Sequence, residues 1–341
     1  MKDIKSMTAL EIADDFKKLG VPSFRSKQVK QWLTKGVCDF NDMSNLPADF
    51  RKVLQENYYI AVATIENKQV SKLDPTSKYL LKLNDGEYIE CVLMSYHHGL
   101  TLCISTQVGC KMGCTFCATG KSGFSRNLAP SEMLAQIETV EKDAGKPISN
   151  LVLMGMGEPL DNYDNVVKFL KLVSSEDGRN LGMRHISLST CGVVPKIYAL
   201  AEEKFPLTLS ISLHAPNDEI RSKTMPVNKI WNVEKLIEAC RYYYGETGRR
   251  ISFEYAMING VNDSDECAKE LVKLLKGILS HVNLIPVNDV TDTGYKKSTR
   301  LAKFQAILEK NGVTATIRRT LGSDIDAACG QLRRRYEKEV I

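Results

Sequence analysis

From residue 100 onward the chain alternates between two hydrophobic patterns. Short runs rich in Val, Ile and Leu predict buried strands at residues 101–106, 150–155, 185–190, 207–213, 251–257 and 281–287. Between these runs, apolar residues recur at helical spacing and predict helices near residues 131–143, 162–174, 195–204, 232–244, 264–277 and 299–310. A last strand-like run covers residues 313–320. This alternation predicts an α/β protein whose parallel sheet is covered by helices.

The number of strand–helix units limits the possible architectures. Six units are fewer than the eight that close a complete barrel. A dinucleotide-binding Rossmann fold is also disfavoured, because no G-x-G-x-x-G turn follows the first strand. We therefore expect an open, partial (β/α)6 TIM-like barrel.

The N-terminal part of the chain follows different patterns. Residues 1–57 predict short helices, because their apolar positions repeat at helical spacing. From Ile60 to Met94, β-branched and polar residues alternate around the turn sequences LDPTS and NDGE, which predicts a small hairpin or sheet. We expect an accessory module over residues 1–95, the barrel over 96–325, and a C-terminal loop with a basic tail over 326–341.

Composition narrows the class of protein. Of the 341 residues, 43% are hydrophobic, which is enough for a large core. The ten cysteines are not needed as disulfide staples in a chain of this length, and neither a signal-peptide pattern nor a membrane-spanning apolar run is found. We expect a cytoplasmic protein without a membrane partner. A net charge of +5 is compatible with RNA binding without being diagnostic of it.

The peptide GCKMGCTFCATG carries Cys110, Cys114 and Cys117 in the pattern C-x3-C-x2-C. Structural zinc sites and ordinary electron-transfer clusters use four protein ligands. Three thiolates instead leave one iron of a [4Fe-4S] cluster open, and the amino and carboxylate groups of S-adenosylmethionine (SAM) can bind it. Half of a zinc site is the alternative, although no second Cys or Cys/His pair follows at the usual distance.

Other candidate residues follow the predicted strands, where the active sites of parallel α/β folds lie. Gly157 and Glu158 follow the second strand, where a glycine lets a ligand approach the backbone and a carboxylate can bind an ammonium group. Candidate partners for the ribose or adenine of SAM are Ser189, Ser212, Leu213, His214 and Asn288. Taken singly, each has a simpler interpretation. Gly157 and Glu158 could form an ordinary turn, the Ser189 hydroxyl could bond within its own turn, and His214 could be a packed histidine at the start of a helix.

Two further cysteines are candidates for chemistry. Cys329 lies among the small residues of SDIDAACGQLR, and a mobile nucleophile loop requires such residues. Its alternative is a small buried hydrophobic residue, which cysteine often is. Cys103 lies on the first strand of the predicted barrel, and its side chain can point into the barrel.

Several peptides together carry a resemblance to a known family. They are TLCISTQVGCKMGCTFCATG, LVLMGMGEPLDN, ISLSTCGVVP, SISLHAPND, HVNLIPVN and TIRRTLGSDIDAACGQLR. This set resembles the RlmN/Cfr family of radical-SAM RNA methyltransferases from about Glu90 to Arg333, and more weakly over the N-terminal helices. The resemblance implies methylation of C2 of an adenosine in 23S rRNA, and of the adenosine beside the anticodon in certain tRNAs. Cfr-like methylation of C8 is the alternative, but VGC, GKSGFSRN and RRTLGSDID are closer to the RlmN branch.

The resemblance implies a role for each candidate residue. Cys110, Cys114 and Cys117 would bind the [4Fe-4S] cluster. The SAM contacts would be Gly157, Glu158, Ser189, Ser212, Leu213, His214 and Asn288. Cys329 would carry the methyl group, Cys103 would form a transient disulfide with it, and Glu90 would accept a proton, unless it is a solvated residue at a strand edge. Asp289 stands where the family usually has proline, so the turn after Asn288 can differ in shape.

The chemistry of adenine explains why such an enzyme needs a cluster. C2 is an electron-poor aromatic carbon and cannot attack a SAM methyl group as a nitrogen or a thiolate can. The resemblance implies two SAM molecules per turnover, one to methylate Cys329 and one that is cleaved reductively at the cluster. It further implies an external electron donor such as flavodoxin or ferredoxin, and we expect a monomer.

Basic residues in both flanking segments are candidates for RNA phosphate contacts. They are Arg25, Lys27, Lys30 and Lys35 near the N-terminus and Arg333, Arg334 and Arg335 in the tail. A solvated charged surface is the alternative. A different class of protein, a non-catalytic RNA-binding protein with a zinc ion or a cluster, also stays open at this point.

Overall fold

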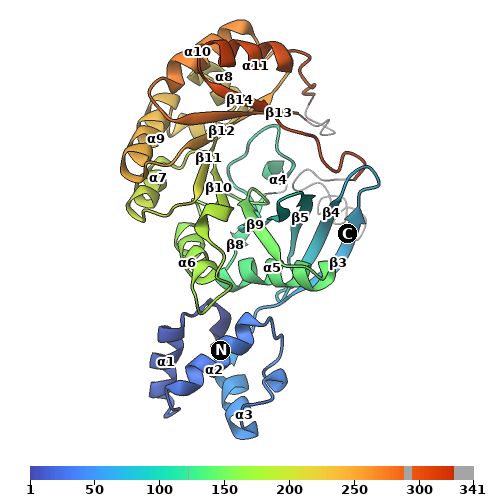
Figure 1. Ribbon diagram of the computed structural model, residues 1–341, viewed down its shortest axis with the longest axis vertical. Helices are drawn as coiled ribbons and strands as arrows, with labels where there is room; N and C mark the ends of the chain where they lie inside the picture. The colour runs from blue at the N-terminus through green and yellow to red at the C-terminus, as the bar shows by residue number, and fades with distance from the viewer. Residues whose placement is uncertain (122, 288–293, 326–341) are drawn as a thin grey trace.

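The computed structural model describes residues 1–121, 123–287 and 294–325, and a ten-stranded sheet lies at its centre (Figure 1). The strand order is β14-β13-β12-β11-β10-β9-β6-β5-β4-β3. Every neighbouring pair from β6 to β14 is parallel. These strands are β6 (Gly99–Cys103), β9 (Ile148–Leu153), β10 (Ile186–Thr190), β11 (Thr208–Ser212), β12 (Ile251–Met257), β13 (Ser280–Pro286) and β14 (Thr314–Ile317).

Helices connect the parallel strands and cover their outer face. They are α5 (Pro130–Ala144), α6 (Tyr163–Ser174), α7 (Val194–Glu202), α9 (Val233–Thr247), α10 (Asp265–Leu275) and α11 (Leu301–Lys310). Their apolar sides and the strands form one large hydrophobic core. All strands and helices predicted after residue 100 are confirmed, with ends that differ by a few residues. Within the described residues the two edge strands, β3 and β14, do not pair, so the prediction of an open partial barrel is confirmed.

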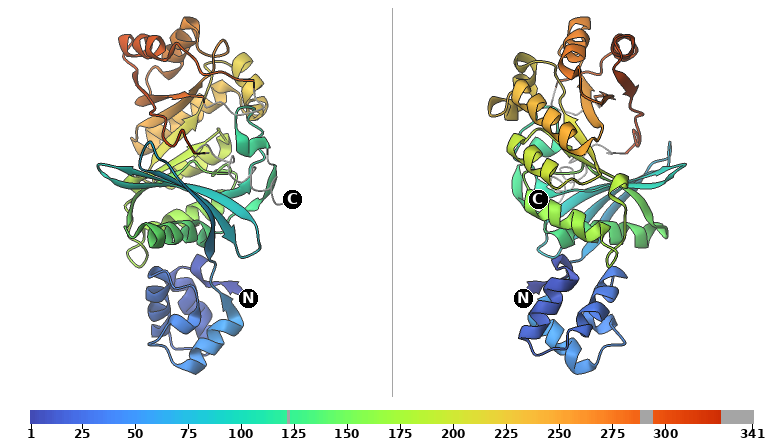
Figure 2. Two further views of the ribbon diagram at one scale, coloured as in Figure 1. Left: turned by 90° about the vertical axis from the view of Figure 1, so that its right-hand side faces the viewer. Right: turned by 60° about the vertical axis from the view of Figure 1, so that its left-hand side comes forward.

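Three strands between residues 63 and 96 extend this same sheet. They are β3 (Ala63–Val70), β4 (Thr76–Leu83) and β5 (Tyr88–Tyr96), and they run antiparallel to one another and to β6. The predicted hairpins are therefore present, but they belong to the large sheet and do not form a small sheet of their own. Figure 2 shows the long strands of this extension beside the barrel. The predicted turns LDPTS and NDGE connect β3 to β4 and β4 to β5. The strand β5 then pairs with β6, the first strand of the barrel.

The N-terminal helices form a module with its own hydrophobic core, which ends at Ile60 (Figure 1). Its helices are α1 (Ala9–Lys18), α2 (Phe24–Thr34) and α3 (Ala48–Asn57), beside a small sheet of β1 (Lys2–Asp3) and β2 (Tyr58–Tyr59). Thr8 and Glu11 cap α1 reciprocally, which fixes where this helix begins. The buried Lys5 ammonium bonds to Glu138 of α5 at 2.6 Å and ties the module to the barrel.

Several short elements escaped the sequence analysis. They are β7 (Gln107–Gly109), α4 (Ala118–Lys121), β8 (Phe124–Asn127), α8 (Asp218–Thr224) and the 3-10 helices η1 (Ile4–Ser6), η2 (Phe40–Asp42), η3 (Met183–His185) and η4 (Pro226–Lys229). Two of them, α8 and η4, follow β11 and lie against the site described below. Among the described residues, no helix has the length and apolar character needed to cross a bilayer.

Candidate active site

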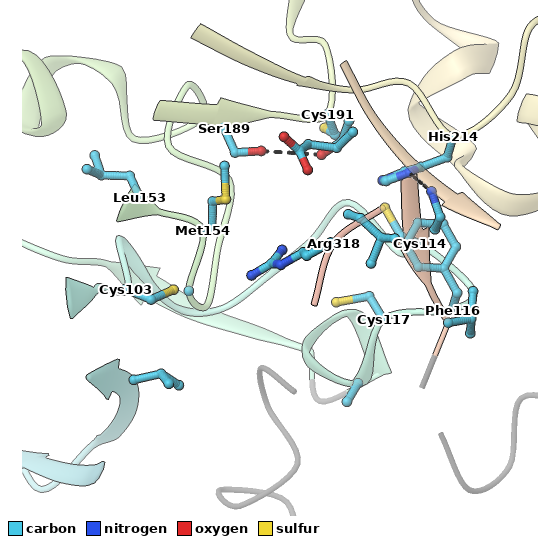
Figure 3. A pocket seen from close by; sticks show the side chains of 18 of the residues that line it. Cys103, Cys114, Phe116, Cys117, Leu153, Met154, Ser189, Cys191, His214 and Arg318 are labelled. Atoms are coloured by element: carbon cyan, nitrogen blue, oxygen red, sulfur yellow. Dashed lines mark hydrogen bonds between the residues drawn. The ribbon is translucent and has the colours of Figure 1, made fainter. Parts of the chain in front are cut away.

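A cavity of about 390 Å³ opens at the carboxyl ends of the parallel strands. Five cysteines line it, namely Cys103, Cys110, Cys114, Cys117 and Cys191. Figure 3 shows Cys103 on one side of the cavity and Cys114 and Cys117 on the other. Residues far apart in the sequence therefore meet here, as expected for strand ends in a parallel sheet.

The loop with the three cysteines begins at a small antiparallel pair of strands, β7 and β8. The amide of Cys110 donates to the carbonyl of Gly123 at 2.8 Å, and the amide of Cys117 donates to the carbonyl of Cys114 at 3.1 Å. Gly109 has a φ of +78°, and a Cβ there would lie 2.0 Å from the Gly123 carbonyl oxygen. Only glycine allows this close approach of the two strands, which sets the entry into the cysteine loop.

The donor set fits a cationic, thiolate-binding group. Burial raises the pKa of the Cys110 thiol to about 12 and also raises the pKa of Cys114, to which Cys117 and Cys110 add by repulsion. Iron removes these thiol protons on binding and offsets the repulsion. Within the described residues, no group of three His, Cys, Asp or Glu side chains is arranged to bind a single metal ion. A [4Fe-4S] cluster does not need that convergence, because each thiolate binds a different iron.

Gly157 and Glu158 line the cavity beyond the end of β9. The Glu158 carboxylate accepts hydrogen bonds from the Cys191 amide at 2.7 Å and from the Leu160 amide at 2.9 Å. Burial raises the pKa of Glu158, and these backbone hydrogen bonds oppose the rise. Gly157 has a φ of +102°, and a Cβ there would lie 2.6 Å from the Cβ of Gln107. The Glu158 carboxylate lines the cavity and can only accept hydrogen bonds when ionised, so it is a suitable partner for an ammonium group there.

Ser189, Ser212 and His214 come from the ends of β10 and β11 and also line the cavity. The two serine hydroxyls lie 3.3 Å apart (Figure 3). Leu213, predicted with them, lies fully buried in the hydrophobic core, so any contact with SAM would have to use its backbone.

His214 is held as a neutral imidazole. Its Nδ1 accepts from the amide of Ala256 at 2.9 Å, and burial lowers its pKa to about 3. The remaining proton therefore lies on Nε2, which is the nitrogen left to donate to a ligand. The ring of Phe116, from the cysteine loop, packs edge-on against it at 4.9 Å between centroids. His214 thus connects the cysteine loop to the strand ends.

Cys103 points into the cavity from β6 and is almost fully buried. It packs with Val92 and Met94 of β5, and Met154 and Leu321 border the same cluster. The expectation that this side chain points into the barrel is confirmed.

Glu90 lies on the same face of β5 as Val92 and Met94 but is only 2% exposed. Its carboxylate forms an ion pair of 2.9 Å with Lys78 of β4, whose side chain is fully buried. The alternative of a solvated residue at a strand edge is therefore wrong. Neither residue is among those that line the cavity itself.

The segment that leads toward Cys329 is described as far as Ile325. It is attached to the β3–β4 turn, where Asp324 accepts from the Ser71 hydroxyl at 2.6 Å and from the Lys72 amide at 2.7 Å. Asp74 of that turn accepts from the Gly322 amide at 2.7 Å. Cys329, Asn288, Asp289 and the tail residues Arg333, Arg334 and Arg335 lie outside the described residues.

Three charged residues in the cavity wall were missed by the sequence analysis, namely Glu254, Arg318 and Arg319. Glu254 is 4% exposed on β12 and accepts from the Asn283 amide group at 2.7 Å. Burial raises its pKa, which nearby Arg318 opposes. Arg318 and Arg319 follow β14 and are exposed at the cavity. A single carboxylate within the apolar run ISFEYAM was a signal that could have identified Glu254.

The basic residues of α2 and its C-cap differ in exposure. Arg25 is half-buried beside Phe24 and Phe50, whereas Lys27 and Lys35 are exposed. Lys30 is buried, and its ammonium donates to the Met7 carbonyl at 3.2 Å. The prediction of Lys30 as a surface phosphate contact was therefore wrong.

Comparison with known proteins identifies the family. The sequence profile of the Radical SAM superfamily matches residues 104–275, and that of the ribosomal RNA large subunit methyltransferase N-terminal domain matches residues 2–60. A probable dual-specificity RNA methyltransferase RlmN from Alkaliphilus oremlandii is 54% identical over 336 residues, which is 98% of each chain. The chain belongs to the RlmN family of radical-SAM methyltransferases.

Two further relatives of the RlmN-family chain agree with this assignment. The probable dual-specificity RNA methyltransferase RlmN of Clostridium tetani is 55% identical and covers 92% of this chain and 91% of its own length. The crystal structure of a radical SAM methyltransferase from Sphaerobacter thermophilus superimposes with a TM-score of 0.92 at 42% identity, covering 97% of this chain and 99% of that one. Radical-SAM enzymes use a [4Fe-4S] cluster and SAM, which agrees with the predicted cofactors.

Proposed function

We propose that this protein methylates C2 of an adenosine in 23S rRNA, and of the adenosine beside the anticodon in certain tRNAs. The observation that carries the proposal is the position of Cys103, which lines the same cavity as the three cysteines of the cluster motif. A methyltransferase in which a nucleophile attacks the SAM methyl group directly needs neither an iron–sulfur cluster nor an additional cysteine in the active site. The names of the relatives, dual-specificity RNA methyltransferases, support both classes of RNA.

Different residues bind the cluster and the different parts of SAM. Cys110, Cys114 and Cys117 hold the [4Fe-4S] cluster, which when bound supplies the electron that cleaves SAM. Glu158 accepts from the SAM ammonium group, beside the close backbone of Gly157. Ser189, Ser212 and the Nε2 proton of His214 hydrogen-bond the ribose and adenine, together with the backbone of Leu213 and the side chain of Asn288.

Three residues of this chain handle the methyl group. Cys329 takes a methyl group from one SAM and carries it as a thioether. After the methylene carbon has bonded to C2, Glu90 accepts the C2 proton, with Lys78 as its ion-pair partner at 2.9 Å. The unpaired electron of the adduct would return to the cluster, and the thiolate of Cys103 then attacks the sulfur of Cys329. The S–S bond forms as the S–C bond breaks, and the released carbon takes up a proton to become the methyl group of the product. An external reductant must restore both thiols.

RNA reaches the cavity through basic surfaces on two sides. The helical module contributes Arg25, Lys27 and Lys35, and the cavity mouth contributes Arg318 and Arg319. The separate core that ends at Ile60 supports a division of the chain near residue 60, with the helical module as the RNA-docking part. The partners we propose are 23S rRNA, tRNA and a flavodoxin- or ferredoxin-like donor, for a monomer in the cytoplasm.

The test is a single-turnover reaction with defined RNA. Anaerobically reconstituted protein, SAM and a chemical reductant are incubated with unmodified 23S rRNA fragments and tRNA, and the digested nucleosides are identified by mass spectrometry against 2-methyl- and 8-methyladenosine standards. We expect 2-methyladenosine from both RNAs. 8-Methyladenosine would instead indicate Cfr-like chemistry, and a colourless zinc protein without product would indicate an RNA-binding protein.

The same samples test the methyl carrier. After incubation with SAM and before RNA is added, the peptide that contains SDIDAACGQLR should carry one extra methyl group on Cys329. A methyl group found only on another cysteine would contradict this assignment.

A further inference from the structure

Arg221 is a buried charged residue that the proposed function leaves without a role. It lies on α8, directly behind the cavity wall, and is 0% exposed. Its Nε donates to the Leu213 carbonyl at 3.0 Å, and its Nη1 donates to Oδ1 of Asn228 at 3.0 Å. Its Nη2 donates to the carbonyls of Cys191 at 2.6 Å and Ser212 at 3.2 Å. One guanidinium therefore joins the ends of β10 and β11.

These two strand ends carry the residues proposed to hold SAM. The Cys191 amide binds the Glu158 carboxylate, and the carbonyl of the same residue binds Arg221. Ser212 and Leu213, bound by Arg221 through their carbonyls, directly precede His214. Arg221 thus fixes the backbone from which Ser212 and His214 reach the cavity, and it positions Cys191, whose amide binds the Glu158 carboxylate.

The positive charge of Arg221 is not neutralised by its contacts. All four hydrogen-bond acceptors are neutral oxygens, and within the described part of the chain no carboxylate forms an ion pair with this side chain. Asp218 of the same helix makes no ion pair with Arg221: its Oδ1 accepts from Asn228 and from the Val233 amide, and its charge raises the pKa of Arg221 by less than burial lowers it. Burying a charge without an opposite charge is costly, so a purely structural tie would not require a cation here.

The same helix also receives the cysteine loop. The amide of Thr115 donates to the Thr224 carbonyl at 2.9 Å, and the amide of Met225 donates to the Arg221 carbonyl at 2.7 Å. Thr115 directly follows the cluster cysteine Cys114, so the cluster-binding loop is attached to the same helix as Arg221. The charge of Arg221 therefore lies between the cluster ligands and the SAM-contacting strand ends.

We infer that Arg221 is a positioning residue with a fixed charge: it holds the SAM-contacting ends of β10 and β11, and its guanidinium makes the cluster easier to reduce. The inference rests on the proposed function, because it requires a cluster at the three cysteines. A reduced cluster carries one more negative charge than the oxidised one. A nearby cation in a low-dielectric interior stabilises that extra electron and raises the reduction potential.

The test separates the charge from the hydrogen bonds. Arg221→Lys keeps the positive charge but cannot make the branched hydrogen bonds of a guanidinium group. Arg221→Gln loses both the charge and these hydrogen bonds. Each variant is reconstituted, its iron, sulfide and circular dichroism are recorded, and the midpoint potential is measured by an anaerobic titration followed by electron paramagnetic resonance. SAM affinity is measured on the same samples by equilibrium dialysis.

We expect the midpoint potential to become more negative in Arg221→Gln and to stay near the wild-type value in Arg221→Lys. SAM affinity should fall in both, by about tenfold or more, because buried charged hydrogen bonds are lost. A Lys variant whose potential shifts as much as that of Gln would overturn the charge role, and a Lys variant with unchanged SAM affinity would overturn the positioning role. If Arg221→Gln does not fold, the neutral variant Arg221→Met takes its place in the comparison of midpoint potentials, and Arg221→Lys still tests SAM affinity.

Arg249→Gln is the matched control. This arginine also binds a backbone carbonyl, that of Leu207 at 3.5 Å, but at the amino end of β11. Its removal should change neither the potential nor SAM affinity, and a shift equal to that of Arg221→Gln would show a general charge effect and overturn the inference. Failure of the wild type to bind iron or SAM would contradict the proposed function, whereas differences among the variants bear on Arg221 alone.

Discussion

The cavity has two walls that are built in different ways. The cofactor wall consists of the cysteine loop with Glu158, Ser189, Ser212 and His214, and its polar groups are held by backbone amides and carbonyls. The transfer wall consists of Val92, Met94, Cys103, Met154 and Leu321, and it is apolar apart from its sulfur atoms. The cofactor wall comes from parallel strand ends, whereas the transfer wall lies mainly where the antiparallel extension joins the barrel.

This difference shows which groups have to be fixed before reaction. A small polar cofactor needs donors and acceptors in fixed directions, and strand-end loops with buried hydrogen bonds provide them. A flat adenine ring and a thioether need an apolar surface that excludes water and lets a thiol approach. The antiparallel extension supplies this surface, and Cys103 is its one nucleophile among the residues just named. Each prediction below changes one wall and asks whether the other is affected.

The largest effect is expected from the cofactor wall. Cys114→Ala should abolish cluster retention, from about four irons per chain to almost none, and with it all RNA methylation, because two thiolates do not hold the cluster. Iron and sulfide analysis after anaerobic reconstitution measures this. Cys267→Ala, a buried cysteine on α10 outside the cavity, is the control and should retain its iron. Normal methylation by iron-free Cys114→Ala would refute radical-SAM chemistry.

Loss of the thiol on the transfer wall should stop the reaction later. Cys103→Ala should bind the cluster and methylate Cys329 normally, but accumulate a covalent protein–RNA adduct, since the thioether link needs an attacking thiolate for release. A denaturing gel with labelled RNA detects the adduct.

The control for this variant is Cys91→Ala. Cys91 lies on the neighbouring strand β5 but faces the hydrophobic core on the other side of the sheet. It should turn over without an adduct. Free methylated RNA formed by Cys103→Ala at the wild-type rate would mean that another group releases the product.

The cofactor wall was largely predictable from the sequence, because its chemistry follows buried parallel strands that read as apolar runs. Strands such as β11, with Leu209 and Ile211 fully buried, mark their own ends, and Ser212 and His214 follow directly. Arg221 escaped because it is one of four charged residues in the short helix DEIRSKT and does not stand out there, and the single carboxylate Glu254 in the run ISFEYAM was overlooked. Only the tertiary structure shows that their charges face the cavity wall.

The transfer wall was harder to predict. The alternation of β3 to β5 shows hairpins, but it does not show which sheet they join, since pairing with β6 is a long-range choice. Lys30 was also predicted wrongly, because its charge suggested an exposed residue although its side chain is buried. Its position with Ser26 and Leu33 on the buried side of α2 was visible in the helical spacing.

The smallest expected effect concerns the attachment of the transfer wall to the C-terminal segment. Asp324 binds Ser71 and Lys72, and it lies five residues before Cys329 in the sequence. The Ser71 hydrogen bond contributes most to lowering the pKa of Asp324, so the carboxylate is ionised at neutral pH. The stabilisation is therefore present above the ordinary carboxyl pKa and is lost as the pH falls through the lowered value.

Asp324→Ala should therefore loosen this attachment at neutral pH while leaving the cofactor wall intact. We expect faster amide hydrogen exchange in residues 71–76 and a several-fold slower methylation of Cys329, with unchanged iron content and SAM affinity. Exchange mass spectrometry and peptide methylation rates measure the two effects. Asp85→Ala, at the turn on the other end of β4, is the control, because its partners are Glu87 and Arg126 rather than the C-terminal segment. Unchanged exchange in Asp324→Ala would mean that Leu321 and the Gly322–Asp74 hydrogen bond hold the segment without it.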